Sequence, residues 1–171
     1  MRTKSEIIDL RPTSPDDLAD LMVLWNDGRI MRWVGFPDGL GYDIAAMTAW
    51  YERLQANPLR HHFTAASDIL GFCGEAYYAV NLQHRRAGLD IKLRVPAQGG
   101  GRATAAFRML IERVFRSEPL VDIVWTEPAV SNLAARTLYW QCGLRPAQRP
   151  ADMSEDPRYD VSYWELRRED R

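Results

Sequence analysis

Three consecutive glycines, Gly99 to Gly101, constrain this chain more than any other feature of its sequence. They lie between an apolar-alternating run that ends at Val95 and a strongly periodic helical segment. Without side chains at the start of a helix, the backbone N–H groups are exposed, and the helix dipole favours negative charge there. A phosphate or pyrophosphate suits such a position. The sequence therefore predicts a phosphate-binding junction between a strand and a helix.

Length and composition favour one soluble domain. Of the 171 residues, 46% are hydrophobic and 26% are charged, and the formal net charge is −1. These values are ordinary for a globular protein, and the balanced charge does not attract nucleic acid or anionic membranes. Cys73 and Cys142 are too far apart for a zinc or disulfide framework. Because we find neither a signal peptide nor a membrane-length apolar run, we expect a cytoplasmic protein without nucleic-acid or membrane partners.

Hydrophobic periodicity predicts elements in the order β-α-α-β-β-β-α-β-α-β. The predicted strands cover residues 7–11, 61–66, 69–80, 87–95, 121–126 and 161–166. The predicted helices begin at residues 14, 43, 102 and 132, and residues 26–41 are expected to form a loop or a broken helix. This order favours an α+β (mixed α/β) fold, with helices on both faces of one mixed sheet. We expect a single domain over residues 1–171, with 167–171 as a disordered, solvated tail.

Two familiar phosphate-binding patterns fit the glycine loop poorly. A P-loop needs a lysine and a hydroxyl at fixed spacing, and Arg102 replaces the lysine. A dinucleotide fingerprint would use Gly99, Gly101 and Thr104, with Glu127 as the ribose-binding acid. However, the third small residue is missing and too few strands follow for paired mononucleotide-binding halves. Nicotinamide-dependent redox chemistry therefore remains a minor alternative.

A third pattern covers almost the whole chain. Gln98, the three glycines, Arg102 and Ala103 resemble the Gln/Arg-x-x-Gly-x-Gly/Ala motif of the GNAT N-acetyltransferase superfamily. Further along, Asn132, Tyr139 and Gly143 resemble that family's second motif, which has an asparagine, a tyrosine on the following helix and a closing glycine. The chain is similar to the ribosomal-protein alanine acetyltransferase-like and aminoglycoside 6′-N-acetyltransferase-like branches.

The resemblance implies a GNAT fold with a mostly antiparallel central sheet, and direct acetyl transfer from acetyl-CoA to a primary amine in a ternary complex. It assigns Asn132 to the pantetheine of CoA and Tyr139 to protonation of the leaving thiolate, so that CoA is the product. The two positions are seven residues apart, which places both side chains on one helix face. The implied cofactor-binding residues are Gln98, Gly99, Gly100, Gly101, Arg102, Ala103, Thr104, Asn132 and Arg136, with the arginines near phosphate charge.

Two residues depart from the family's motifs, and several of the implied site residues also have a purely structural explanation. Gly100 stands where the family usually has a basic residue, and Leu144 where it has phenylalanine, but neither change removes a backbone donor. The glycines are also compatible with a flexible turn, Asn132 with a helix cap, and Tyr139 with a core aromatic. As a set, these residues favour a functional site. A non-catalytic acyl-CoA-binding module on the same scaffold is the second hypothesis.

The acceptor amine must lose a proton before it attacks a thioester. Asp90 is the first candidate base because it lies on the polar face of the strand that leads to the glycine loop. Its Gly-Leu-Asp segment resembles that of the aminoglycoside branch, whose aspartate acts on the acceptor amine. An ion pair with Lys92 or Arg94 is the structural alternative. Glu75 is the second candidate, and a water chain remains open because Gly88 replaces the glutamate of the alanine-acetyltransferase branch.

Trp33 and Phe36 are candidate acceptor-binding residues, unless they only pack their loop onto the core. The segment 149–160 is expected to complete the acceptor pocket. Its charged residues are Arg149, Asp152, Glu155, Asp156, Arg158 and Asp160. No metal site is expected, because the adjacent His61 and His62 point to opposite faces of a strand. The acceptor is expected to be a peptide N-terminus or a small amine such as an aminoglycoside, and a homodimer is possible.

Overall fold

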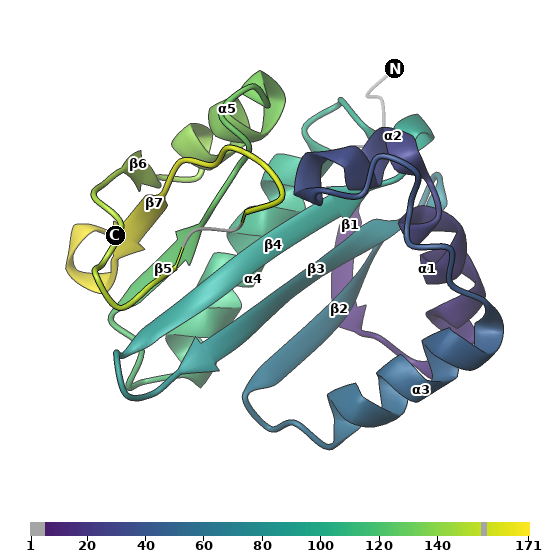
Figure 1. Cartoon of the computed structure of the whole chain (residues 1–171), viewed down its shortest axis with the longest axis horizontal. Helices are drawn as coiled ribbons and strands as arrows, with labels where there is room; N and C mark the ends of the chain where they lie inside the picture. Colours follow the sequence, from purple (N-terminus) through teal and green to yellow (C-terminus); the bar gives the residue numbers. More distant parts are fainter. Residues whose placement is uncertain (1–5, 155–156) are drawn as a thin grey trace.

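One seven-stranded sheet organises the chain in the computed structural model, which describes residues 6–154 and 157–171. The strand order is β1-β2-β3-β4-β5-β7-β6, and among the strands of the described residues only the β4–β5 pair is parallel (Figure 1). The strands are β1 (Ile8–Pro12), β2 (Arg60–Ser67), β3 (Gly71–Asn81), β4 (Arg86–Leu93), β5 (Ile123–Thr126), β6 (Arg145–Pro146) and β7 (Trp164–Arg167). The predicted mixed, mostly antiparallel sheet is confirmed.

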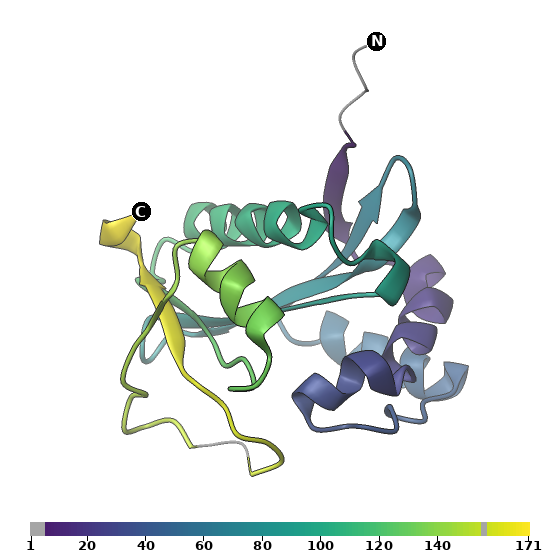
Figure 2. The same ribbon diagram turned by 90° about the horizontal axis from the view of Figure 1, so that it is seen from above.

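Helices cover both faces of the sheet, as the sequence predicted (Figure 2). α4 contacts β1, β3 and β4 on one face, where α5 packs beside it, and α1 and α3 contact β3 and β2 on the other. The helices are α1 (Leu18–Trp25), α2 (Gly28–Met31), α3 (Ile44–Gln55), α4 (Arg102–Ser117) and α5 (Leu133–Gln141). None of those in the described part of the chain combines the length and apolar character needed to cross a bilayer.

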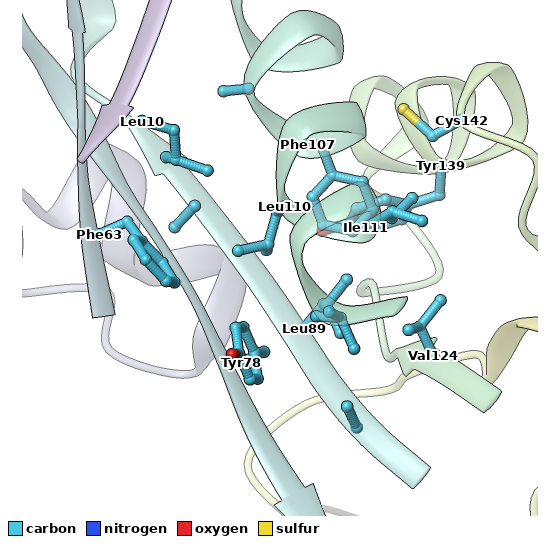
Figure 3. Close-up of a cluster of buried hydrophobic side chains, with 14 of the residues drawn as sticks. Leu10, Phe63, Tyr78, Leu89, Phe107, Leu110, Ile111, Val124, Tyr139 and Cys142 are labelled. Carbon is cyan, nitrogen blue, oxygen red and sulfur yellow. The ribbon is translucent and has the colours of Figure 1, made fainter. Parts of the chain in front are cut away.

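Two apolar cores hold these layers together. The larger one lies between the sheet and α4, where Leu10, Tyr78, Leu89 and Phe107 interlock (Figure 3). The smaller one joins α1, α2 and α3 around Leu21 and other fully buried side chains. The strands therefore turn an almost wholly apolar face toward α4, whereas their opposite face also carries polar residues. Those polar residues belong to the site described below.

The sheet opens between β4 and β5. The two strands pair from Arg86 with Ile123 to Gly88 with Trp125, and beyond Gly88 β4 continues to Leu93 paired with β3 but no longer with β5. A short 3₁₀ turn, Val95–Ala97, and the three glycines link the end of β4 to α4. The opening and the start of α4 are thus brought to the same edge of the structure.

The prediction of a disordered tail at 167–171 is wrong. Arg167 ends β7, and a 3₁₀ turn over Arg168–Asp170 follows it. The Arg168 guanidinium donates hydrogen bonds of 2.6–2.9 Å to the carbonyl oxygens of Phe115, Glu118 and Val121. Carbonyl groups at a helix C-terminus lack intrahelical partners, so an arginine from a distant part of the chain can cap them. The charge of the tail alone did not reveal this partner.

Smaller differences concern irregular segments. Of the two alternatives predicted for 26–41, a loop or a broken helix, the structure has the broken helix, formed by α2 and a 3₁₀ turn over Arg32–Val34. β5 begins at Ile123 and β7 at Trp164, each later than predicted, and the two-residue β6 was not predicted at all. These strands are short because each pairs with its neighbour over only a few residues, a property of the sheet that the local sequence does not encode.

Candidate active site

The glycine loop forms an open cradle of backbone N–H groups. Gly99, Gly100 and Gly101 have φ angles of +84°, +62° and +78°, a left-handed conformation that other residues rarely adopt. Among the described residues, the N–H groups of Gly101, Ala103 and Thr104 have no hydrogen-bond acceptor. A Cβ atom at Gly99 or Gly101 would meet no heavy atom within 4 Å. The loop therefore has the donors and the free space that an anionic group requires.

A cavity of about 1100 Å³ connects this cradle with the opening between β4 and β5. It brings together most of the residues that the sequence singled out. Its lining includes Gln98, Gly99, Gly101, Ala103, Thr104, Asn132, Tyr139, Asp90, Glu75, Trp33 and Phe36. Gly100, Arg102 and Arg136 do not line it.

The two arginines expected near phosphate charge have other partners. The Nε of Arg102 donates a 2.8 Å hydrogen bond to Glu6, and its guanidinium folds back over the glycine loop. Arg136 donates a 3.0 Å hydrogen bond to the carbonyl oxygen of Val130. Both contacts hold loops that border the cavity. A role in phosphate binding remains a prediction for each arginine, and it requires the side chain to leave its present partner.

Asn132 is the N-cap of α5 and also lines the cavity. Its side-chain oxygen accepts a 3.1 Å hydrogen bond from the backbone N–H of Ala135. Its side-chain amide donates to no acceptor in the described residues, so these donors are available to a ligand. The capping role and the ligand-binding role, which the sequence presented as alternatives, are compatible at this position.

Tyr139 presents a buried phenol to the cavity. Its ring packs against Phe107 with 4.9 Å between the centroids (Figure 3), and the residue is 4% exposed. Burial and the negative charge of Asp90 raise the pKa of the phenol above its ordinary value, although a hydrogen bond with Thr126 acts in the opposite sense. The phenol therefore keeps its proton at neutral pH, as a general acid must.

Asp90 and Glu75 share one cation. Both carboxylates pair with the ammonium group of Lys92, which lies 3.3 Å from Glu75 Oε1 and in direct contact with Asp90. Burial by itself would lower the pKa of Lys92, but the two carboxylates outweigh it and raise that pKa well above the ordinary value. The lysine side chain is only 10% exposed and thus carries a buried, permanent charge.

Glu75 is held by further donors from two other elements. Its Oε2 accepts hydrogen bonds from Trp25 Nε1 at 2.7 Å and from His62 Nε2 at 2.9 Å. The other ring nitrogen of His62 lies 2.8 Å from the hydroxyl of Thr13. Burial would raise the pKa of Glu75, but the Lys92 charge and the bonds from His62 and Trp25 lower it to about 2. The carboxylate is therefore ionised, and both of its oxygens already have partners.

Sequence reasoning had named Asp90, Glu75 and Lys92 but missed His62 and Trp25 as their partners. The strand register explains the cluster, because Glu75 lies opposite Lys92 and Tyr77 lies opposite both Asp90 and His62. These residues alternate with apolar ones along each strand and so share one face. The alternation itself was a signal, but it did not specify which positions face one another.

Acid should weaken the fold through two buried carboxylates, Glu75 of this cluster and Asp17 outside it. The pKa of Glu75 is about 2, and that of Asp17 is also about 2 because hydrogen bonds from Arg11 and Ser14 outweigh the effect of burial. Both values are depressed from about 4 in an unfolded chain. The stability that these groups contribute is therefore complete above about pH 4.5 and is lost as the pH falls toward 2.

Thermal unfolding between pH 7 and pH 2.5 checks this expectation. The melting temperature should change little down to about pH 5 and then fall steeply. An Asp17→Asn variant, which removes one of the two groups, should melt lower at pH 7 and show a shallower decline in acid. A wild-type melting temperature that stays constant from pH 5 to pH 2.5 would contradict the assignment.

Aromatic side chains form the far end of the cavity. Trp33 and Phe36 line it, and the guanidinium groups of Arg32 and Arg158 lie over their rings at 4.6 Å and 4.7 Å. On the opposite wall, Trp125 covers Gly88, where a Cβ atom would lie 2.7 Å from the indole ring. The tryptophan thus takes the space in which the expected glutamate of the alanine-acetyltransferase branch would stand.

The segment 149–160 contributes less to the cavity than the sequence suggested. Arg158 and Tyr159 line it, but Asp152 does not and pairs with Arg86 at 2.8 Å. Glu155 and Asp156 lie outside the described residues. Within the described ranges, no three histidine, cysteine, aspartate or glutamate side chains gather in a way that could hold a metal ion.

Comparison with known proteins places the chain among acetyltransferases. The sequence profile described as "Acetyltransferase (GNAT) domain" matches residues 8–145. No curated protein matches the sequence significantly.

Solved structures share the whole architecture. The spermidine N-acetyltransferase from Vibrio cholerae, in complex with CoA and spermine, superposes with a TM-score of 0.82 at 19% identity, covering 95% of this chain and 96% of that one. The aminoglycoside acetyltransferase AAC(6′)-Ib with coenzyme A and kanamycin gives 0.78 at 22% identity, covering 96% of both chains. Its complex with ribostamycin and coenzyme A gives 0.78 at 23% identity, covering 95% and 94%.

Proposed function

The chain belongs to the GNAT acetyltransferase family, and we propose that it transfers the acetyl group of acetyl-CoA to a primary amine. The observation that carries this proposal is the single cavity that joins the glycine cradle to Tyr139 and Asp90. Similar folds with bound CoA and amines support it. A cofactor with a pyrophosphate fits the cradle, because unpaired N–H groups and free space are both present there.

In this proposal each group has a separate task. The N–H groups of Gly101, Ala103 and Thr104 bind the pyrophosphate, and the amide of Asn132 donates to the pantetheine. Bound acetyl-CoA supplies an activated acetyl group whose thiolate is a good leaving group. Beyond Gly88, β4 keeps its pairing with β3 but not with β5, and this part of β4 lines the channel between the cradle and Tyr139.

The proton balance assigns Asp90 and Tyr139 opposite roles. The acceptor arrives as an ammonium ion and loses a proton to Asp90, directly or through water, before its nitrogen attacks the acetyl carbon. The carbon–sulfur bond breaks, and Tyr139 protonates the sulfur. The attacking nitrogen then gives up its second proton, which returns to the Tyr139 oxygen directly or through water, and Asp90 releases the first proton to solvent. An ammonium and acetyl-CoA thus give an amide, CoA and one released proton. No bond to the protein forms.

Glu75 is a poorer base than Asp90. Its carboxylate is 1% exposed, has a pKa of about 2 and already accepts two hydrogen bonds beside the Lys92 ammonium. Asp90 is more exposed, with 22% of its side chain accessible. We therefore propose that Glu75 positions Lys92 and that Asp90 contacts the acceptor. A cytoplasmic location and a homodimer remain predictions.

Replacement of Gly101 by leucine should weaken CoA binding at least about tenfold. The new side chain would project into the cradle, where no protein atom lies within 4 Å of a Cβ, and would occupy the phosphate position. Isothermal titration with CoA measures the effect. Gly71→Leu is a matched control, because Gly71 has a φ of +66° and equally open surroundings at the first residue of β3.

The two variants carry similar backbone strain, so any stability loss should be shared. If both variants bind CoA with equal affinity, the glycine loop is not part of the cofactor site. Titrations of the wild-type protein with acetyl-CoA and NAD, followed by a thiol-release assay with amines, test the wider proposal. NAD binding without CoA binding, or CoA binding without transfer to any amine, would overturn it in favour of a redox enzyme or a non-catalytic module.

A further inference from the structure

The acceptor end of the cavity combines an aromatic wall with carboxylates that already pair with cations of the protein itself. The wall is a continuous series of rings. Trp25 packs edge-on against Tyr42 and Trp50, Trp50 packs against His62, and His62 stacks on Tyr77, with centroid distances from 4.7 to 6.0 Å. All five residues line the cavity. An apolar or aromatic body would find extended contact here.

The carboxylates of this cavity are already paired. In the described residues its lining contains three acids, Glu75, Asp90 and Glu127. Lys92 pairs with both Glu75 and Asp90, and the guanidinium of Arg149 lies 2.7 Å from the carboxylate of Glu127. A ligand with several ammonium groups needs several unpaired carboxylates, because each desolvated cation must recover its lost hydration.

A further cation stands in the same wall. The guanidinium of Arg60 lies 5.1 Å from the centre of the Tyr77 ring and lines the cavity. No carboxylate in the described part of the chain pairs with it. Glu75, Asp90 and Lys92 together carry one negative charge, which one acceptor ammonium balances, and the charge of Arg60 then opposes the entry of a second ammonium group. One acceptor ammonium can still bind Asp90, whose carboxylate has acceptor sites left beyond Lys92.

We infer that Lys92 sets the acceptor class of this site, and that the acceptor is a primary amine on an apolar or aromatic body with no second cationic group. Lys92 acts as an internal counter-cation, which occupies the place of the extra ammonium groups of a polycation. This inference rests on the proposed function, since it names the acceptor of the same reaction. It separates the chain from polycation-acetylating proteins of similar fold.

An acceptor panel tests the inference on the intact protein. 2-Phenylethylamine and tryptamine represent the inferred class, and spermidine and kanamycin represent polycations. We expect kcat/KM, measured by CoA thiol release, to be at least about tenfold higher for the aromatic amines. A higher value for spermidine or kanamycin would overturn the inference while leaving the proposed function intact.

A binding experiment separates the two possible failures. Titration of each amine into the CoA-saturated protein reports selectivity even without turnover. Tighter binding of spermidine or kanamycin overturns the inference. Binding of the aromatic amines without transfer from acetyl-CoA supports the acceptor class and overturns the proposed function instead. Binding of none of the four amines overturns both.

Variants at Lys92 test its particular role. Lys92→Met frees both carboxylates, so the ratio of kcat/KM for spermidine to that for 2-phenylethylamine should rise at least about tenfold, mainly through KM for spermidine. Lys92→Arg keeps the charge and should keep the wild-type ratio. Arg85→Met removes one charge from an exposed pair with Asp122 outside the cavity, and should leave the ratio unchanged.

The double variant Lys92→Met/Glu75→Gln serves as a second test in case Lys92→Met alone does not fold. It removes both charges of the buried pair but leaves Asp90 without its lysine, so the preference should still move toward spermidine. An unchanged ratio in whichever of the two variants folds would show that Lys92 does not set the acceptor class. If neither variant folds, the wild-type panel still decides the acceptor class. Lys92→Arg then tests the role of the charge, because a variant that keeps the positive charge and yet prefers spermidine would exclude the counter-cation role.

Discussion

Tyr139→Phe should lower kcat about 10²- to 10⁴-fold and leave CoA affinity nearly unchanged. Phenylalanine retains the ring that packs against Phe107 and loses only the hydroxyl, which bonds with Thr126 in the cavity lining. The lost group is the proposed donor to the leaving thiolate, so the chemical step should slow while the cofactor still binds. Steady-state turnover with a saturating amine, together with a CoA titration, measures both quantities.

Tyr78→Phe is the matched control for this substitution. Tyr78 is a buried tyrosine in the same core (Figure 3), but its hydroxyl bonds to Glu118 and does not line the cavity. Its loss should affect stability and not turnover. If Tyr139→Phe turns over within about twofold of the wild type, the general-acid role of Tyr139 is excluded, because even a modest general acid contributes more than that.

The pH dependence of kcat gives a second test of the general-acid role of Tyr139. Burial and the charge of Asp90 raise the pKa of its phenol above the ordinary value of about 10. A general acid fails when it loses its proton, so the alkaline loss of kcat due to this group should begin only above pH 10. A kcat that falls by half near pH 8 in the wild type but not in Tyr139→Phe would contradict this environment.

The glycine loop and the long helices could be predicted because their signals are local. The three glycines specify the left-handed turn on their own, and the apolar stripe of α4 specifies its buried face. The second long helix, α3, begins after Asp43, whose side chain accepts a hydrogen bond from the N–H of Ala46, as the sequence indicated. Such features involve residues within one or two turns of each other.

The charged cluster could be predicted only in part because it depends on register. Asp90 and Lys92 are neighbours on one strand, so their pairing was foreseeable as an alternative. The contact of Glu75 with Lys92 requires the β3–β4 register, and its bond with His62 requires the β2–β3 register, which includes a bulge between Ala65 and Ala66. Registers follow from the packing of the whole sheet, and a shift of one residue would move each of these side chains to the other face.

The arginine of the glycine motif shows a second kind of limit. Arg102 was expected to meet phosphate, yet its guanidinium pairs with Glu6, which lies 96 residues away in the sequence. A charged residue beside a binding motif has many candidate partners, and only the tertiary structure decides which is near. The backbone donors of the same loop have no such freedom, so predictions about them are more secure than predictions about the arginine.

Lys92→Met should destabilise the folded protein by about 3–5 kcal/mol at pH 7. The substitution leaves Glu75 ionised at 1% exposure without its cation, and the bonds from Trp25 and His62 replace only part of the lost interaction. Urea unfolding at pH 7 measures the difference. The exposed pair of Arg85 and Asp122 serves as the comparison, because Arg85→Met should change stability by about 1 kcal/mol or less.

The double variant and the pH dependence show whether the buried charge is the cause. Glu75→Gln added to Lys92→Met removes the unpaired charge but keeps an oxygen that accepts from Trp25 and His62, so most of the lost stability should return.

In acid, the wild type itself loses the contribution of ionised Glu75, whereas the single variant can protonate that carboxyl at a higher pH. The gap between the two proteins should therefore narrow below about pH 4.5. A gap that stays constant from pH 7 to pH 3, or a double variant no more stable than the single one, would trace the loss to packing of the lysine stem. Narrowing together with recovery would mean that Lys92 is retained for its charge, in the part of the cavity where the acceptor is expected to bind.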